Sequence, residues 1–147
     1  MKNQFEDDYK IYTDLNAKFR ESLKGPINYM KNIESEYNAW YRKADARDSY
    51  YMKVFWLYCQ ARKFGNIFID IEDNICNRDI AKGMVSVMKR FGIEYFTFSS
   101  YRSGAIESAW IFQQEGCTVE KLVEINGRLG DFGDEIKKTP AYLFKIN

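Results

Sequence analysis

The spacing of apolar residues changes near Gly65, and this change limits the folds that are open to the chain. Before Gly65, apolar residues recur at steps of three and four, which is typical of amphipathic helices. After it, apolar and polar residues alternate from Ile67 to Glu72, which indicates a half-buried strand. The 147 residues therefore predict a helical part followed by a part that mixes helices with strands.

The first 64 residues predict two or three helices. One apolar stripe covers about residues 4–23, and the sequence KGP ends it because glycine suits a helix C-terminus and proline suits a helix start. A second apolar pattern covers residues 27–64, with the polar segment RKADARDS in its middle. That segment is either a turn with Asp48 or Ser49 as N-cap or the solvated middle of one long helix, and we favour two helices.

The rest of the chain predicts the order β-α-β-α-β-β. The first of its helices begins after Asn77 and stops at Gly92, because asparagine is a good N-cap and glycine a good C-terminal residue. Ser103 is the expected cap of the second helix, whose expected inward face is Ile106, Ala109, Trp110 and Gln113. The expected later strands are IEYFTFSS, TVEKLVEING and PAYLFKIN.

We therefore expect an α+β fold in a single domain, residues 1–147. Its helical part is residues 1–64, and its α/β part is residues 65–147, with a sheet of about four strands.

Composition excludes several kinds of chemistry. The chain has no histidine, which removes histidine acid–base catalysis and most zinc and haem sites. Its 3 cysteines have no metal-ligand spacing and are expected to be free thiols. The N-terminus has no signal-peptide pattern, and no window approaches the roughly 20 apolar residues that span a bilayer. We expect a cytoplasmic protein with no cofactor and no membrane partner.

An acidic group follows the first predicted strand and consists of Asp70, Glu72 and Asp73. Asp70 and Glu72 are two residues apart on a strand, so they share a face and are able to hold Mg²⁺ through oxygen ligands. The group predicts a metal-dependent nuclease or phosphodiesterase as an alternative function. A solvated strand end followed by a turn is the reading that we favour.

Two further motifs have ordinary structural explanations as well. Arg102 beside the helix start at Ser103 is suited to bind an anion, although a plain helix cap explains it better. The tripeptide Glu135-Ile136-Lys137 matches the Glu-x-Lys of metal-dependent nucleases, but a hairpin loop is favoured because it lies in a polar, glycine-containing connection with Asp131 and Asp134.

The middle helices carry more aromatic rings than one helix stripe can bury, interleaved with cations. Exposed rings beside cationic groups are typical of protein interfaces and of base-stacking surfaces. Burial of the same helices on two sides, in a bundle or a homodimer, explains the pattern equally well. The predicted partner-binding residues are Tyr37, Trp40, Tyr41, Arg42, Lys43, Arg47, Tyr50 and Lys53, together with Tyr101 and Arg102.

The segment IEYFTFSSYRSGAIESAWIFQQEGCTVEKLVEIN, with the closing PAYLFKIN, resembles an uncharacterised family of small proteins carried on bacterial mobile elements and phages. The resemblance covers about half of the chain and carries no catalytic motif. Proteins of that origin are often inhibitors of host defence, including anti-CRISPR proteins. The resemblance thus implies an anti-defence inhibitor.

The leading hypothesis is a non-enzymatic binding protein that inhibits or modulates a larger partner, with a host defence nuclease as the expected protein partner. The alternatives are the metal-dependent nuclease on the acidic group and a regulator that binds nucleic acid.

Overall fold

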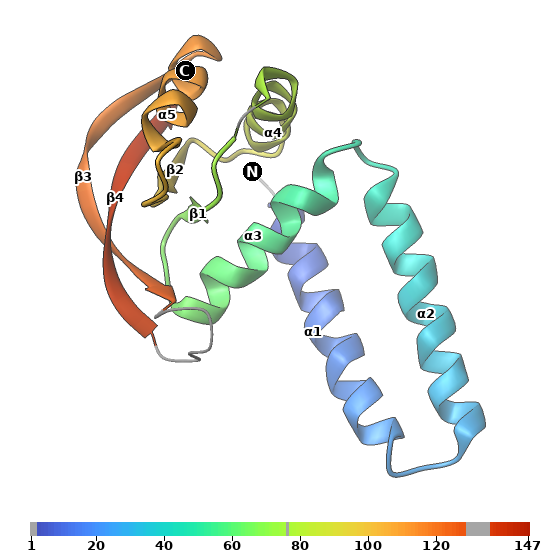
Figure 1. The fold of residues 1–147 in the computed structure, drawn as a ribbon. Coiled ribbons are helices and arrows are strands. Elements are labelled where there is room, and N and C mark those ends of the chain that lie inside the picture. Colours follow the sequence, from blue (N-terminus) through green and yellow to red (C-terminus); the bar gives the residue numbers. More distant parts are fainter. Residues whose placement is uncertain (1–2, 76, 129–135) are drawn as a thin grey trace. The chain divides into compact units, whose positions relative to one another are not determined.

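The computed structural model describes residues 3–75, 77–128 and 136–147 and contains five helices and four strands in those ranges (Figure 1). The elements are α1 (Gln4–Ser22), α2 (Ile27–Asp45), α3 (Tyr51–Phe64), β1 (Ile69–Ile71), α4 (Arg78–Arg90), β2 (Tyr95–Phe98), α5 (Ala105–Gln114), β3 (Cys117–Arg128) and β4 (Ile136–Ile146). This arrangement confirms the predicted α+β class with N-terminal helices and a four-stranded sheet.

The residues fall into two compact units, Met1–Met52 and Lys53–Asn147. The boundary between the units lies within α3 and therefore earlier than the change of hydrophobic spacing at Gly65. None of the described helices is long and apolar enough to cross a membrane.

The first unit is a hairpin of α1 and α2 followed by the start of α3 (Figure 1). Residues 27–64 form two helices, as favoured from the sequence, because α2 ends at Asp45 and α3 begins at Tyr51. Asp48 lies in the connection, and its Oδ1 accepts a hydrogen bond of 3.0 Å from the backbone N–H of Tyr50. The side chain of Asp48 thus satisfies a backbone donor at the start of α3.

A buried carboxylate joins the three helical segments of the first unit. Asp8 on α1 has an exposure of 0% and accepts hydrogen bonds from Trp40 Nε1 at 3.1 Å and from the Tyr51 hydroxyl. Arg47 donates to the same carboxylate from Nε at 3.3 Å and from Nη2 at 3.2 Å. Because its oxygens have several donors, one of them charged, Asp8 remains buried without an unsatisfied acceptor.

The second unit contains a mixed sheet with the strand order β1-β2-β4-β3. β1 is parallel to β2, whereas β4 is antiparallel to both β2 and β3. Therefore β1, β2 and β3 run in the same direction, and their carboxyl ends lie at one edge of the sheet.

One face of the sheet carries two rows of apolar side chains, set by the strand register. The first row contains Phe96 and Phe144, which pair across β2 and β4, and Phe112 of α5 packs on both at ring distances of 5.0 Å and 5.6 Å. The second row contains Phe98, Tyr142 and Leu122, which pair across β2, β4 and β3. Leu122 and Tyr142 are 63% and 44% exposed, so the second row is left partly uncovered.

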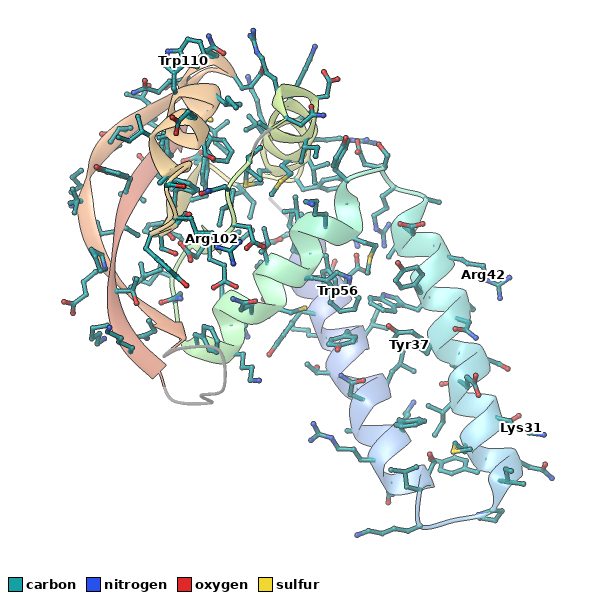
Figure 2. The ribbon with its side chains drawn as sticks, in the orientation of Figure 1. Lys31, Tyr37, Arg42, Trp56, Arg102 and Trp110 are labelled. Atoms are coloured by element: carbon teal, nitrogen blue, oxygen red, sulfur yellow. The ribbon has the colours of Figure 1, made fainter. Side chains whose placement is uncertain are left out.

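The start and the inward face of α5 differ from the sequence prediction. The N-cap is Gly104, without a side-chain cap, and not Ser103. The buried residues are Ser108 and Phe112, whereas Ile106 and Trp110 are 82% and 59% exposed, and Trp110 projects away from the sheet (Figure 2). Ser108 fixes the rotation of the helix, because its Oγ accepts from Ile75 N at 2.9 Å and donates to Ile75 O at 3.2 Å.

Candidate binding groove at the carboxyl edge of the sheet

The ends of the parallel strands bring together segments that are far apart in the sequence. Glu72 follows β1, Ser99 to Tyr101 follow β2, and Gly127 lies near the end of β3. Lys137 and Lys138 lie at the start of β4, which begins at this same edge. In α/β sheets, ligands commonly bind outside the carboxyl ends of parallel strands.

A groove of about 600 Å³ lies at this edge. This volume is within the range of ligand-binding pockets, about 300–1,000 Å³. The second row contributes to its apolar lining through the exposed Leu122 and Tyr142 and through Phe98, which is only 2% exposed and is contacted by Phe112. The other lining residues are Glu72, Ser99, Ser100, Tyr101, Gly127, Lys137, Lys138, Thr139, Pro140 and Ala141.

The groove combines apolar surface with hydroxyl groups and cations. Tyr101 is 90% exposed, so its ring is available to a bound molecule. Tyrosine rings cover apolar surface and keep the hydroxyl able to bond. Lys137 and Lys138 are exposed and place positive charge beside these rings.

The connections after β1 and β2 are tied to each other. Ser100 Oγ donates to Asn74 Oδ1 at 2.5 Å, and the backbone N–H of Arg102 donates to Ser100 Oγ at 3.4 Å. At Gly104 an added Cβ would lie 2.7 Å from Asn74 Nδ2, so a side chain there would displace Asn74. These contacts position Tyr101 in the groove.

Asp70 lies behind the groove, on the opposite face of the sheet from Phe98. Its carboxylate accepts hydrogen bonds of 2.6 Å from Thr97 Oγ1 and 2.6 Å from Ser99 Oγ. Burial raises the pKa of Asp70, against the lowering effect of these two hydrogen bonds. Ser99 therefore links a half-buried carboxylate to the groove that it lines.

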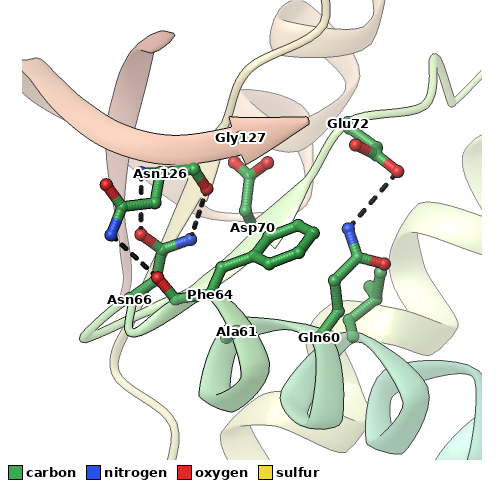
Figure 3. A pocket seen from close by; sticks show the side chains of 9 residues that line it. Gln60, Ala61, Phe64, Asn66, Asp70, Glu72, Asn126 and Gly127 are labelled. Carbon is green, nitrogen blue, oxygen red and sulfur yellow. Dashed lines mark hydrogen bonds between the residues drawn. The ribbon is translucent and has the colours of Figure 1, made fainter. Parts of the chain in front are cut away.

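Asp70 and Glu72 also line a small cavity of about 10 Å³ beside the end of α3 (Figure 3). The volume corresponds to about one water molecule. Gln60 Nε2 donates to Glu72 Oε1 at 3.4 Å across this cavity. Within residues 3–75, 77–128 and 136–147, no three His, Cys, Asp or Glu side chains gather in a group that could hold a metal ion. Asp70, Glu72 and Asp73 therefore do not meet at one point.

The other acidic motif is only partly covered. Asp131, Asp134 and Glu135 lie outside the described residues. Lys137, which was expected in a hairpin loop, lies in β4, because this strand begins at Ile136.

The predicted residues of the middle helices have different roles in the first unit. Trp40 is 8% exposed, and its indole N–H and the Arg47 guanidinium both bind Asp8. Tyr37 contacts the rings of Tyr12, Trp40 and Tyr41, and burial raises its pKa. Trp40 and Arg47 thus stabilise the interior of this unit.

The remaining predicted residues are more accessible. Arg42 and Lys43 are exposed on α2, and Arg42 projects away from α1 (Figure 2). Tyr41 and Tyr50 are half-buried, and Lys53 is exposed at the start of the second unit. Arg102 is exposed in the second unit next to Tyr101, and only Tyr101 of these predicted residues lines the groove.

The sequence did not point to Leu122, Tyr142 or Lys138, and it indicated Lys137 only as part of the Glu-x-Lys motif and not as a groove residue. Leu122 and Tyr142 occupy apolar positions of predicted strands, where a buried side chain is the ordinary expectation. Only the cross-strand register shows that they pair beside Phe98 and extend beyond Phe112.

Residues 53–146 match the model of a protein family described as a domain of unknown function, DUF7698. The chain belongs to the DUF7698 family. The DUF7698 match begins at Lys53, the residue at which the second compact unit begins. The groove is thus a feature of the DUF7698 domain, and the hairpin of α1 and α2 precedes that domain. Searches found no matching curated protein and no matching solved structure.

Proposed function

We propose that the chain is a non-enzymatic binding protein that inhibits or modulates a larger protein partner, and that its DUF7698 domain holds a segment of this partner in the groove. The observation that carries the proposal is the exposed pair of Leu122 and Tyr142 in the groove that Tyr101 also lines. Leu122 and Tyr142 pair directly across β3 and β4 and remain 63% and 44% exposed.

The chemistry of the groove favours a protein segment with both apolar and acidic side chains. Tyr101 and Tyr142 offer rings that are typical of interface hot spots, and burial of such rings supplies most of the binding energy. Lys137 and Lys138 favour carboxylates in the bound segment. Ser99 and Ser100 offer hydroxyl groups for hydrogen bonds to its backbone.

The resemblance of the chain to proteins of mobile elements and phages makes a host defence nuclease the first partner to test. Inhibition then consists of covering a surface that the nuclease needs, and requires no chemical step on this chain.

Affinity capture of the tagged full chain, followed by binding measurements with the recovered partner, tests the proposal. Tyr101→Ala combined with Tyr142→Ala should weaken binding at least about 30-fold, which corresponds to a loss of about 2 kcal/mol at two hot-spot rings. Trp110→Ala is the matched control, because Trp110 is 59% exposed but does not line the groove. Undiminished binding of the double variant would show that the partner binds elsewhere.

A third variant tests the surface predicted on α2. It combines Tyr41→Ala, Arg42→Ala and Lys43→Ala, and keeps Arg47 because Arg47 binds the buried Asp8. Loss of binding in this variant alone would place the partner on the helical hairpin.

A second candidate function is binding of single-stranded nucleic acid. It is favoured by the presence of two tyrosines and two lysines in one groove, since bases stack on exposed rings and phosphates pair with cations. A labelled oligonucleotide should then bind with an affinity that falls steeply as salt increases. Cleavage of the same oligonucleotide in the presence of Mg²⁺ or Mn²⁺ tests the nuclease alternative on Asp70, Glu72 and Asp73. The wild-type chain should then cleave it, and the Asp70→Ala variant should not.

A further inference from the structure

β4 is longer than the strand that pairs with it on the β2 side. β2 pairs only with residues 142–145 of β4, whereas β3 pairs with β4 from Ile136 to Ile146 (Figure 1). Among the described residues, the stretch 136–141 of β4 therefore has a strand partner on one side only. Its other side is an open sheet edge, and this edge lies in the groove, since residues 137–141 line it.

The chain leaves this edge directly after β2. The backbone N–H of Ser99 donates to the Ile71 carbonyl at 3.0 Å, and Ser100 Oγ donates to Asn74 Oδ1. Both bonds join the connection after β2 to β1 and to the segment that follows β1. The groove is lined by this connection and by residues 137–141, so it lies where an extension of β2 along β4 would continue.

The register of β4 shows which of its backbone groups point toward the open edge. In an antiparallel sheet, the N–H and C=O of successive residues point to opposite neighbours. The Ile146 N–H donates to the Glu94 carbonyl at 2.8 Å, on the β2 side. The register shift of the β3–β4 pair lies on β3, between Val119 and Lys121, so the alternation continues along β4 without a break. Even-numbered residues of β4 therefore direct their backbone groups toward β2 and toward the open edge beyond it.

Lys138 and Pro140 are the even-numbered residues of β4 that line the open edge. Lys138 offers an N–H and a carbonyl, whereas Pro140 offers only a carbonyl, because proline has no N–H. The backbone hydrogen bonds among the described residues include none that reaches Lys138 or Pro140 from this side. Proline is compatible with β4 here because its missing N–H falls on the side without a strand partner. The edge thus presents one donor and two acceptors at strand spacing, which matches the backbone of an extended polypeptide.

The side chains at the edge favour an acidic segment. Lys138 projects to the same face as Tyr142 and Lys137 to the opposite face, because side chains alternate along a strand. Both lysines are exposed, so carboxylates on either face of an added strand would meet a cation. Two copies of this edge, paired with each other, would place Lys138 opposite Lys138 or would place Pro140 where the ladder needs a donor. A second copy of the chain is therefore a poor occupant.

We propose that the groove holds its partner by strand addition, an inference that rests on the proposed function. An extended segment of the partner protein pairs antiparallel with residues 137–141 of β4, in line with β2. Its backbone bonds to Lys138 and to the Pro140 carbonyl, and its apolar side chain opposite Pro140 packs beside Tyr142. Because the segment runs opposite to β4, its carboxylates opposite Lys138 and Lys137 follow this apolar residue toward the C-terminus.

A methylation scan of a bound peptide tests the backbone bonds. Selection from a random octapeptide library displayed on phage, with the full chain as bait, supplies the peptide. The recovered sequences should contain an apolar residue followed two positions later by an acidic pair. An added strand directs every second N–H to β4, so methylation of single peptide nitrogens should weaken binding at least about 5-fold at alternate positions and little between them.

Two changes in β4 test the same bonds from the protein side. Lys138→Pro removes the N–H at the open edge, and Lys138→Ala is the matched control that loses only the side chain. Lys138→Pro should bind the peptide at least about 5-fold more weakly than Lys138→Ala. Pro140→Ala adds an N–H on this side and should bind it about 3-fold more tightly. Neither position directs its N–H toward β3, so the β3–β4 ladder keeps its bonds, and Pro140→Ala remains informative if Lys138→Pro fails to fold.

Failure of strand addition differs from failure of the proposed function. Peptide binding that is lost when Tyr101→Ala is combined with Tyr142→Ala, but that shows no alternation in the methylation scan, would keep the groove as the binding site and overturn strand addition. A selection that enriches no peptide would overturn strand addition as well, whether or not the groove binds the labelled oligonucleotide. Peptide binding that the double tyrosine variant does not weaken would contradict the proposed function, and this inference with it.

Discussion

The side chain of Asn66 pairs with the backbone of Asn126 in both directions. Asn66 Nδ2 donates to the Asn126 carbonyl at 2.8 Å, and the Asn126 N–H donates to Asn66 Oδ1 at 2.9 Å (Figure 3). Asn126 Nδ2 also donates to the Phe64 carbonyl at 2.8 Å. One amide side chain therefore replaces a strand partner and joins the end of α3 to the end of β3.

Removal of this amide should destabilise the DUF7698 domain. Asn66→Ala removes both bonds and leaves two partly buried backbone groups without a partner, so we expect a loss of about 2 kcal/mol in the free energy of unfolding. Denaturation in urea measures it. Asn32→Ala, at an exposed site on α2, should change the free energy by less than about 0.5 kcal/mol. Equal stability of the two variants would contradict the structural role of Asn66.

Asp8 should be the most sensitive carboxylate of the first unit. Asp8→Asn removes the charge that pairs with Arg47, and it places an amide among the donors of Trp40 and Tyr51. We expect a loss of about 2–4 kcal/mol, because one partner of a buried ion pair is left without its counter-charge. Thermal unfolding followed by circular dichroism measures the change. Asp14→Asn, whose exposed ion pair with Lys18 contributes little, should have almost no effect.

Two aromatic residues of α5 should differ in how much stability is lost when each is replaced by alanine. The smaller ring, Phe112, should contribute more than the larger ring, Trp110. Phe112 is 0% exposed and contacts Phe96, Phe98 and Phe144, so Phe112→Ala should cost about 3–5 kcal/mol. Trp110→Ala removes a larger ring that is 59% exposed and should cost less than about 1 kcal/mol. Unfolding midpoints in urea compare the two. If Trp110→Ala lost more stability than Phe112→Ala, Trp110 would lie on the inward face of α5, as the sequence predicted.

The charge of Asp70 should make stability depend on pH. Burial raises its pKa above the ordinary 3.8, so the folded state holds the proton more tightly than the unfolded chain. Its contribution to stability is therefore complete below 3.8 and is lost as the pH rises through the raised folded value. Asp70→Asn should be more stable than the wild type at pH 7, and the difference should shrink toward pH 3.5. Thermal midpoints across this range test the sign, and a variant that is less stable at pH 7 would contradict it.

The thiols of Cys59 and Cys117 should react slowly in the folded protein. Burial raises the pKa of Cys59 to about 12 and the pKa of Cys117 to about 11. Very little of either thiol is then ionised at pH 8, and the thiolate is the reactive form. A Cys76→Ser variant isolates these two thiols, because Cys76 lies outside the described residues. Reaction with a disulfide reagent should be slow before denaturant is added and fast afterwards, and fast reaction of the native protein would contradict the expected burial.

The order of the elements could be predicted from the sequence because each element has its own local signals. The cap at Asn77, the stop at Gly92 and the break at Gly25-Pro26 all have local causes, and the structure confirms them. The rotation of α5 has no local cause. Its apolar residues allow two inward faces, and the choice depends on Ser108 binding Ile75, 33 positions earlier.

The groove could be predicted only in part, for the same reason. Tyr101 was among the predicted partner-binding residues, and it lines the groove. Leu122 and Tyr142 become a surface only after β4 inserts between β2 and β3 and sets the register of the second row. Two of the residues predicted on the middle helices, Trp40 and Arg47, bind a buried acid of another helix, Asp8, and the local sequence pattern does not indicate this long-range contact.

The position of β4 has a consequence for how the domain is made on the ribosome. β4 is the last of the four strands to be synthesised, yet it lies between β2 and β3 and is the strand to which β3 is bonded. A nascent chain that has not yet reached residue 136 offers β3 no neighbour with which to form a ladder. The four-stranded sheet can therefore form only after translation has passed β4, and until then β1 and β2 are the only described strands that have each other as a ladder partner.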